Sequence, residues 1–255
     1  MPKYFDIHSH LNFKDFDGDL EEVIQRLRDT DTHTIVVGTD YESSKSAMEI
    51  AEKYEGIYAC IGIHPIDSKD SDISLFSELV KSSKVVAIGE CGLDFYHADK
   101  ATDFERQKNL FLKQVEFALL HDRPLMIHAR DAYPELLEIL EPMKVEHGEK
   151  LRGNIHFFAG NLEQAKRFWN INFSTSFTGV ITFVRDYDEV IKNAPIEMIM
   201  SETDAPFVAP TPYRGKRNEP SYVNEVAQKI AEIRREDLKT TQKALVSNAK
   251  RLFGL

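Results

Sequence analysis

Histidine and carboxylate residues follow several of the short apolar runs in this sequence. The first run leads into His8 and His10, whose side chains point the same way if this segment is a strand, so both imidazoles can reach one metal ion. Later runs lead into further residues of the same chemical kind: His64, Glu90, His128, His156 and Asp204. Histidine nitrogens and carboxylate oxygens are common ligands of divalent transition metals, so the pattern indicates a metal site.

Glu90 is the member of this set that a purely structural role explains least well. It follows Val-Val-Ala-Ile-Gly, an apolar run typical of a buried strand. A buried carboxylate needs a metal ion or a firm ion pair to compensate the loss of its hydration. His128 or His156 alone is more often a structural histidine, and the His-x-His pair can be two polar residues at a strand end. Six of these residues together predict a metal centre: His8, His10, Glu90, His128, His156 and Asp204.

Short β-branched or apolar runs alternate with amphipathic stretches along the chain, which is the pattern of repeated strand–helix units. We expect eight strands, at 4–8, 34–38, 57–63, 85–89, 124–127, 153–156, 171–175 and 196–200. Helices are expected at 19–29, 42–54, 73–82, 103–121, 132–145, 161–168, 185–193, 220–234 and 237–252. Asp19 can cap the first helix, Pro220 fits a first helical turn, and Gly254 suits a terminator.

A chain of 255 residues with this pattern suits one (β/α)₈ TIM barrel that forms a single α/β domain over residues 1–255. The carboxyl ends of the strands converge on one face of such a barrel. Strand ends that are far apart in the sequence would therefore aim their ligand-type side chains at one spot.

The number of candidate ligands indicates how many ions are bound. Four imidazoles and two carboxylates exceed what one ion with an open catalytic position takes, and they suit two divalent ions about 4 Å apart. We assign His8, His10 and Asp204 to the first ion, His128 and His156 to the second, and Glu90 to the bridge between them. Zn²⁺, Mn²⁺ or Ni²⁺ suits four histidines better than Mg²⁺, which prefers oxygen.

Asp204, Glu90 and His64 are the predicted catalytic residues. Divalent ions lower the pKa of a bound water towards roughly 7, and Asp204 can accept its proton. His64 can bond a phosphate oxygen or donate to the leaving group, or it is a structural histidine before Pro65.

Arg130 and a cluster of Arg214, Lys216 and Arg217 are candidates for binding the phosphates of a substrate. The cluster lies in the Pro-rich segment 204–219, which would overhang the mouth of a barrel. A plain loop or a solvated charged face is the alternative interpretation. Several aromatic residues on the expected mouth loops can stack unpaired bases, although some will belong to the core: Phe95, Tyr96, Phe177, Phe207 and Tyr213.

Eight short motifs give the chain a family resemblance. They are FDIHSHL at 5–11, GIHP at 62–65, GECGLDFY at 89–96, IHARDA at 127–132, HFFAG at 156–160, SETDAPF at 201–207, KRNEP at 216–220 and NAKRLFG at 248–254. In this order, and over nearly the whole chain, they resemble the TatD family of metal-dependent deoxyribonucleases, which belongs to the amidohydrolase-like barrels. The resemblance implies metal-dependent hydrolysis of phosphodiester bonds in DNA, by trimming of strand ends, usually described as dependent on Mg²⁺.

The resemblance also implies metal-site roles for Glu90, His128, His156 and Asp204, with His8 and His10 completing the site. The chain departs from the family in HFFAG, where HCFSG is frequent; this changes a packing residue and a hydroxyl and leaves the histidine in place. Glu90 stands where many binuclear amidohydrolases have a carbamylated lysine. This points away from a hydantoinase-like or urease-like arrangement.

The composition limits the remaining classes of function. A net charge of −10, from 32 basic and 42 acidic residues, argues against coating nucleic acid through a broad basic face, but it leaves open a pocket for one strand end. Cys60 and Cys91 lie in apolar runs, which argues against a disulfide framework. Without a signal peptide or a membrane-length apolar run, we expect a cytoplasmic protein that acts on single-stranded DNA ends, with no membrane and no obligate protein partner.

Two other functions compete with this interpretation. A small-molecule metallohydrolase could cleave an amide, a lactone or an aminoacyl ester with the same metal ligands. A non-catalytic protein with a structural metal fits less well, because structural sites are usually closed, tetrahedral and often rich in cysteine.

Overall fold

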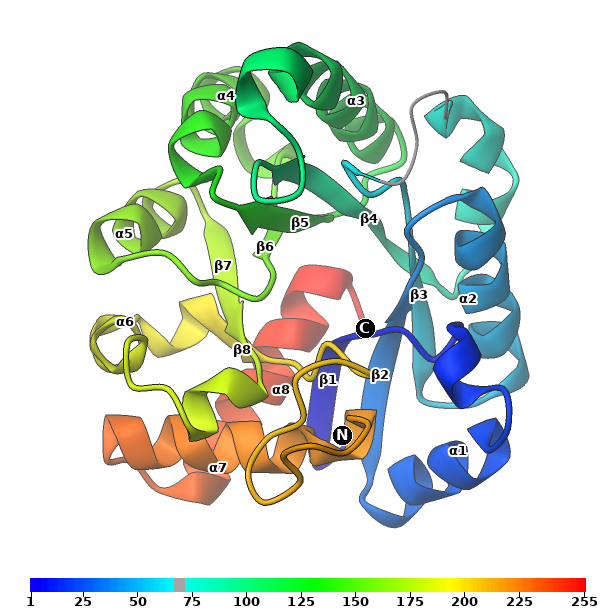
Figure 1. The fold of residues 1–255 in the computed structure, drawn as a ribbon, viewed down its shortest axis with the longest axis vertical. Coiled ribbons are helices and arrows are strands. Elements are labelled where there is room, and N and C mark those ends of the chain that lie inside the picture. The colour runs from blue at the N-terminus through cyan, green and yellow to red at the C-terminus, as the bar shows by residue number, and fades with distance from the viewer. Residues whose placement is uncertain (67–71) are drawn as a thin grey trace.

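The computed structural model describes residues 1–66 and 72–255, and in these ranges eight parallel strands form a ring (Figure 1). They pair in chain order, as the repeated strand–helix pattern predicts. The strands are β1 (Tyr4–Ser9), β2 (Thr32–Val37), β3 (Ile57–Ile61), β4 (Val85–Asp94), β5 (Leu125–Arg130), β6 (Gly153–Ile155), β7 (Phe173–Phe177) and β8 (Ile199–Ser201). The expected TIM barrel is confirmed.

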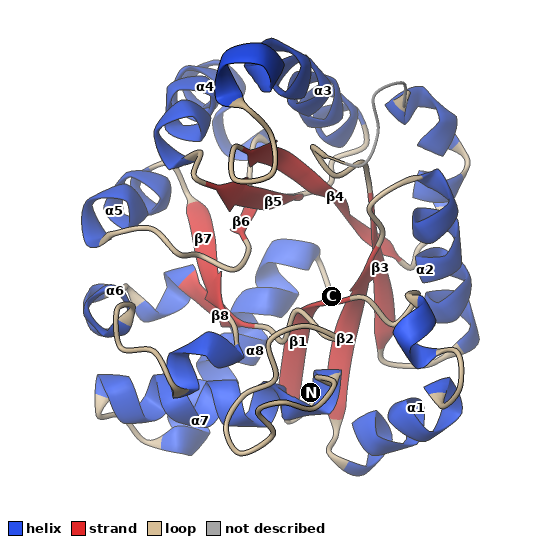
Figure 2. Cartoon of the chain, viewed as in Figure 1, coloured by secondary structure: helices blue, strands red, loops and turns tan. Residues whose placement is uncertain are grey.

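Helices surround the ring of strands (Figure 2). The α-helices are α1 (Leu20–Asp29), α2 (Tyr41–Lys53), α3 (Lys100–Leu120), α4 (Tyr133–His147), α5 (Leu162–Asn170), α6 (Asp188–Asn193), α7 (Val223–Arg234) and α8 (Leu238–Phe253). Short 3₁₀ helices are η1 (Lys14–Phe16), η2 (Ile73–Ser77), η3 (Leu79–Lys81), η4 (Gly148–Lys150), η5 (Gly179–Thr182), η6 (Ile196–Met198) and η7 (Pro220–Tyr222). In the part of the chain that the structure describes, none of the helices has the length and apolar character to cross a membrane.

The helix expected over 73–82 is the main error in the predicted elements. The segment forms the two 3₁₀ helices η2 and η3 instead. Its buried residues Ile73, Phe76 and Leu79 are spaced three apart. That spacing matches the three-residue turn of a 3₁₀ helix, so the same apolar face is buried without an α-helix.

Asp19 occupies the N-cap position of α1, but its side chain accepts no hydrogen bond from the helix backbone, so the predicted cap is wrong. Its two carboxylate oxygens instead lie 2.6 Å from the guanidinium nitrogens of Arg217. The carboxylate therefore ties α1 to the segment after β8. The other two predicted signals are present: Pro220 begins η7, and Gly254 ends α8 with a φ of 71°.

The barrel interior is a packed apolar core that is closed at one end by α8. Side chains such as Phe5, Ile35 and Met126 form one cluster with Val246 and Phe253 of that helix. Figure 1 shows α8 behind the ring of strands. The opposite end, where the strands terminate, is left for the functional site.

The ring closes between β1 and β8 at this same end. Asp204 donates its backbone N–H to the carbonyl of His8 at 2.9 Å, and His10 donates to the carbonyl of Ala205 at 2.7 Å. Lower in the seam, the buried carboxylate of Asp6 accepts hydrogen bonds from the backbone and hydroxyl of Thr203, both at 2.8 Å. The closing contacts therefore fix two strand ends that carry candidate ligands.

Candidate metal centre

Three side chains at the seam between β1 and β8 form the first cluster of the centre. His8 lies in β1, His10 follows that strand, and Asp204 follows β8. The Nε2 atoms of His8 and His10 are 3.2 Å apart. The Oδ1 atom of Asp204 lies 3.7 Å from the first nitrogen and 3.5 Å from the second. These three atoms are close enough to surround one cation.

Three side chains from the neighbouring part of the barrel form the second cluster. Glu90 lies in β4, His128 in β5, and His156 directly after β6. The Oε1 atom of Glu90 is 2.8 Å from His128 Nδ1 and 2.8 Å from His156 Nε2. This cluster also has the size and chemistry of a site for one cation.

Glu90 lies between the two clusters and joins them. Its second oxygen, Oε2, is 3.5 Å from His8 Nε2 and 3.8 Å from His10 Nε2. One oxygen of Glu90 therefore faces each cluster. The structure brings together the six predicted ligands in the two expected groups, while the ions themselves stay a prediction.

Two irregularities in the sheet direct His8 and Glu90 into the mouth. Between Asp6 and Ser9, β1 has one residue more than β2 opposite it, in the stretch that contains Ile7 and His8. Between Ile88 and Cys91, β4 likewise has one residue more than β5, in the stretch that contains Gly89 and Glu90. An extra residue of this kind turns the local side chain away from the regular alternation of the strand.

Glu90 lies inside β4, which runs to Asp94, and not just after a strand that ends at residue 89. The glycines around Glu90 made the strand look shorter in the sequence, yet both are needed for the close approach of β5. A Cβ at Gly89 would lie 2.3 Å from the carbonyl oxygen of Met126, and one at Gly92 would lie 2.0 Å from that of His128. Both glycines also have a positive φ, which side chains rarely tolerate.

Second hydrogen bonds fix the orientation of two imidazoles. His10 Nδ1 lies 3.0 Å from the carbonyl of Val37, so it donates and leaves Nε2 free to bind a cation. His128 Nε2 lies 3.0 Å from Asp94 Oδ2, which in the same way leaves Nδ1 facing Glu90. Asp94 is fully buried and also accepts hydrogen bonds from the backbone of Tyr96 and from His97.

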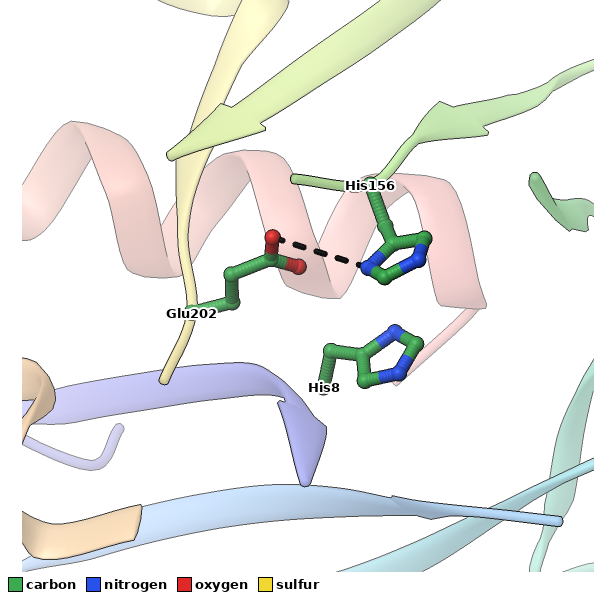
Figure 3. Close-up of side chains that lie close together, drawn as sticks. All are labelled: His8, His156 and Glu202. Carbon is green, nitrogen blue, oxygen red and sulfur yellow. Dashed lines mark ion pairs between the residues drawn. The ribbon is translucent and has the colours of Figure 1, made fainter. Parts of the chain in front are cut away.

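This role of Asp94 has only a weak signal in the sequence. Asp94 is a carboxylate four residues after Glu90, but its partner on β5 becomes evident only when β4 continues through it. Glu202 stands two residues before Asp204, and its position in the sequence does not by itself indicate a role. Its carboxylate oxygen Oε1 lies 3.7 Å from His156 Nδ1, and Figure 3 shows it beside the rings of His156 and His8.

The electrostatics of the site favour a bound cation. Burial raises the pKa of Glu90, but the neighbouring histidines outweigh this effect and hold it well below its ordinary value. Burial lowers the pKa of His156, yet the charge of Glu90 outweighs it and raises the pKa well above its ordinary value. The buried Glu90 carboxylate is thus stabilised by positive charge on the surrounding histidines. A bound divalent ion can supply this positive charge in place of the protons on the imidazoles.

The donor set fits divalent metals. Five of the six predicted ligands are at most 9% exposed, so their polar atoms have lost most of their hydration, and a bound cation would compensate that loss. Two imidazole nitrogens 3.2 Å apart can both bond one ion at about 2.1 Å, the usual zinc–nitrogen distance. Four nitrogens and two carboxylates match zinc, manganese or nickel better than magnesium.

His64 lies in the wall of the same site. Its Nε2 atom is 3.7 Å from Glu90 Oε1, and its ring centroid is 4.5 Å from that of His128. Its Nδ1 atom accepts a hydrogen bond from the backbone N–H of Ile66 at 3.3 Å, so Nε2 carries the proton. Burial lowers the pKa of His64 to about 4, so the imidazole is neutral near pH 7.

The predicted phosphate-binding residues are not equivalent. Arg130, Arg214 and Lys216 are exposed. Arg217 is bound on both sides, by Asp19 at 2.6 Å and by Glu219 at 3.2 Å, and it also donates to the carbonyl of Asp15. Its guanidinium is therefore occupied by contacts within the protein, which argues against the predicted contact with substrate.

Comparisons with known proteins agree with this site. A family model described as TatD related DNase matches residues 5–254. The uncharacterized metal-dependent hydrolase YabD of Bacillus subtilis is 44% identical, over 98% of this chain and 99% of its own. A Shigella flexneri protein named 3'-5' ssDNA/RNA exonuclease TatD is 32% identical, over 98% of this chain and 99% of its own. The crystal structure of YjjV, a TatD homologue from Escherichia coli, has a TM-score of 0.90 and 31% identity, covering 99% of this chain and 98% of that one.

Proposed function

The chain belongs to the TatD family of metal-dependent hydrolases, and from that premise we propose that it is a deoxyribonuclease that shortens single-stranded DNA ends with two divalent ions. The observation that carries this proposal is the pair of ligand clusters joined by one carboxylate, Glu90. Two cations held close together are typical of enzymes that cleave phosphodiester bonds.

Each cluster would hold one ion. The first ion would be bound by His8, His10 and Asp204 and the second by His128 and His156, with Glu90 between them. Divalent ions supply a Lewis acid for the phosphate and lower the pKa of a water at neutral pH. Mg²⁺ or Mn²⁺ is expected at the weaker position and Zn²⁺ at the tighter one, because the histidine-rich clusters favour the softer metal.

Two side chains of the centre can move or donate a proton. Asp204 is the most exposed of the five buried ligands, at 9%, so its carboxylate can reach a water that enters from the mouth and accept its proton. His64 presents Nε2–H beside Glu90 Oε1, and it can donate that hydrogen bond to a phosphate oxygen or to the leaving group.

Exposed aromatic side chains around the mouth suit unpaired bases. Tyr96, Phe207 and Phe183 are 62%, 49% and 40% exposed, so their rings are accessible to a bound strand. The guanidinium of Arg130 lies 4.1 Å from the ring of Tyr96, and that of Arg214 lies 3.9 Å from the ring of Phe183. Pairs of one aromatic ring and one arginine can stack a base and hold its phosphate, as proteins that bind single strands do.

The same surface argues for a strand end in preference to a duplex. The chain carries a net charge of −10, so a long phosphate backbone would gain little from the molecule as a whole. A short single-stranded end can instead contact only the arginines and rings beside the ions. The buried centre also requires the scissile phosphate to enter the mouth, which a free end does more easily.

The test is a panel of end-labelled substrates with the metal-free protein and added Mg²⁺, Mn²⁺ or Zn²⁺. We expect stepwise shortening of a single-stranded DNA oligonucleotide, slower cleavage of the same sequence as a blunt duplex, and no cleavage in a chelator. Labels at the 5' and the 3' end report the direction. An RNA oligonucleotide and amide, lactone and aminoacyl ester substrates complete the panel.

Two results would overturn the proposal. Rapid hydrolysis of an acyl substrate without cleavage of DNA would make the chain a small-molecule metallohydrolase. Internal cleavage of a circular single strand at the rate of a linear one would exclude a requirement for an end. The matched control is His147→Ala, a histidine at the end of α4 that lies outside both clusters and should leave every rate unchanged.

A further inference from the structure

Two imidazoles, one from each cluster, stack on each other beneath the mouth. The ring centroids of His8 and His156 are 3.9 Å apart and their planes differ by 13°. Their Nε2 atoms face the two clusters. Their Nδ1 atoms are buried, and in the part of the chain that the structure describes neither has a hydrogen-bond partner. The other two predicted histidine ligands, in contrast, have an acceptor for their second nitrogen.

Glu202 is the carboxylate next to these unpaired nitrogens (Figure 3). It is fully buried, its Oε1 lies 3.7 Å from His156 Nδ1, and a ring nitrogen of His8 lies within 4.8 Å of the same group. Its Oε1 already accepts the backbone N–H of Phe157 at 2.5 Å, and Oε2 accepts the hydroxyl of Ser176 at 3.1 Å. These two donors fix the carboxylate in place beside the rings.

An imidazole that binds a cation through Nε2 carries its proton on Nδ1. A buried N–H group without an acceptor is destabilising, so binding of both ions requires a hydrogen-bond acceptor for the two Nδ1–H groups at this place. Glu202 has oxygen lone pairs to spare, since a carboxylate accepts about four hydrogen bonds. It is therefore suited to serve both rings.

We propose that Glu202 is a positioning residue shared by the two metal clusters, accepting the Nδ1–H of His156 directly and that of His8 directly or through one buried water. The proposal rests on the metal site of the proposed function. The contact to His156 needs an approach of less than 1 Å to reach an ordinary hydrogen-bond length, whereas the distance to His8 allows a bridging water.

The backbone after His156 supports this role. Phe157 has a φ of 45°, a conformation that is costly for a bulky side chain. The hydrogen bond from its N–H to Glu202 Oε1 holds that conformation. One carboxylate thus orients His156 through both its ring and its backbone.

A third cation among His8, His156 and Glu202 is a poorer explanation of the same cluster. It would have to bind the Nδ1 atoms of two imidazoles whose Nε2 atoms already face the other clusters, so both rings would lose a second proton. Two hydrogen-bond donors, from Phe157 and Ser176, also already occupy the carboxylate.

The test compares Glu202→Gln with Ser174→Ala as the control. Ser174 is buried in β7 like Ser176, but its hydroxyl donates to Asn154 and Gly153 and not to Glu202. Glu202→Gln keeps the side-chain volume, removes the charge and leaves one acceptor oxygen in place of two. Titration of each metal-free protein with Zn²⁺ and Mn²⁺ in a calorimeter measures stoichiometry and affinity. We expect two ions in wild type, with both affinities weakened about 10- to 100-fold in Glu202→Gln and nearly unchanged in Ser174→Ala.

Each other result would overturn the proposal. Unchanged affinities in Glu202→Gln would show that the carboxylate does not act on the ligands, and loss of only one affinity would show that it is not shared. Three ions in wild type and two in the variant would mark a third cation site. Because no nucleic acid is used, a wild type that binds two ions but cleaves no DNA would defeat the proposed function and leave this inference intact.

Metal-free thermal unfolding shows whether the variant folds. If Glu202→Gln does not fold, the zinc-loaded wild type with ¹⁵N-labelled histidine provides the decisive measurement. Imidazole Nδ1–H resonances of His8 and His156 that are protected from exchange with water support the proposal. If either ring lacks a proton on Nδ1, the proposal is wrong.

Discussion

The mouth of the barrel has two layers that differ in how their residues are held. In the lower layer, five of the six predicted metal ligands are buried, and Glu90 lies within 3.8 Å of five imidazoles, those of His8, His10, His64, His128 and His156. In the upper layer, Tyr96, Phe183 and Phe207 are exposed, and the rings of Tyr96 and Phe183 each lie against an arginine. Several contacts hold each side chain of the lower layer in place, whereas the side chains of the upper layer are held by few contacts.

The difference separates the residues that we propose bind metal from those that we propose contact substrate. A buried carboxylate or imidazole must have partners, so the fold constrains its position from several sides. An exposed ring can be repositioned when a strand enters, and its loss costs the folded protein little. Changes in the lower layer should therefore affect metal binding and chemistry, whereas changes in the upper layer should affect only the affinity for long substrates.

The largest effect is expected for Glu90→Ala. Removing this carboxylate deprives both clusters of their common ligand, and the rate of DNA cleavage should fall about a thousandfold or more, which corresponds to about 4 kcal/mol of barrier. Asp204→Ala should have an effect of similar size. Cleavage assays with saturating Mn²⁺ measure both rates, and circular dichroism checks that the fold is kept.

Glu90→Gln is the matched control for shape, because it keeps the side-chain volume and removes the charge. It should be nearly as inactive as Glu90→Ala. Activity above about a tenth of wild type in any of these variants would show that the lower layer is not the catalytic centre.

A smaller and more specific effect separates His8 from His64, both of which have a ring nitrogen within 3.7 Å of Glu90. His8→Ala should lose one of two bound ions on dialysis, because its Nε2 belongs to the first cluster. His64→Ala should keep both ions and lose rate, because its role is to donate a hydrogen bond. Elemental mass spectrometry of the dialysed proteins measures the metal content, and equal contents in the two variants would contradict the assignment.

The sequence predicted that the side chains of the lower layer lie together, and it did so for a physical reason. Burial of a carboxylate such as Glu90, which follows an apolar run, costs free energy unless groups of opposite charge lie beside it. Histidines at the ends of several strands can supply such groups, and a barrel brings those strand ends together. The same logic could not identify Asp94, because its contact with His128 depends on the continuation of β4 through two glycines and an extra residue. That extra residue has no sequence signature of its own.

The upper layer could not be predicted with the same success. Arg214 and Arg217 are three residues apart and chemically identical, yet one lies over Phe183 and the other is bound by Asp19 and Glu219. Distant partners decide this difference, and Asp19 is 198 residues away in the sequence. The prediction of an α-helix over 73–82 was wrong for a different reason. Apolar residues three apart occur in both α-helices and 3₁₀ helices, so the spacing does not distinguish between them.

The third prediction tests the upper layer directly. Arg130→Ala combined with Arg214→Ala should raise KM for single-stranded DNA about tenfold and flatten its salt dependence, because fewer counterions are released on binding. Hydrolysis of bis(p-nitrophenyl) phosphate should hardly change, since this small diester reaches only the lower layer. If both substrates suffered equally, the arginines would be supporting the centre and the two layers would not be separable.

The smallest effect is expected for Arg217→Ala, which tests whether this arginine belongs to the structure. Its guanidinium joins Asp19 and Glu219, and hydrogen bonds from Arg217 are the main reason that the pKa of Asp19 lies below its ordinary value. Because these charges are partly exposed, the loss should lower the free energy of unfolding by only about 1 kcal/mol, or the Tm by about 2 °C.

The pH dependence and the substrate dependence of Arg217→Ala distinguish the two layers. A lowered pKa in the folded state means that the ion pair stabilises the protein above the ordinary pKa of an aspartate and ceases to do so as the pH falls through the folded value. The Tm difference between wild type and variant should therefore be present at pH 7 and shrink on acidification. KM for single-stranded DNA and its salt dependence should stay at wild-type values in thermal-shift and kinetic measurements run in parallel. A variant with unchanged Tm at pH 7 and a raised KM for DNA would instead place Arg217 among the residues that bind substrate.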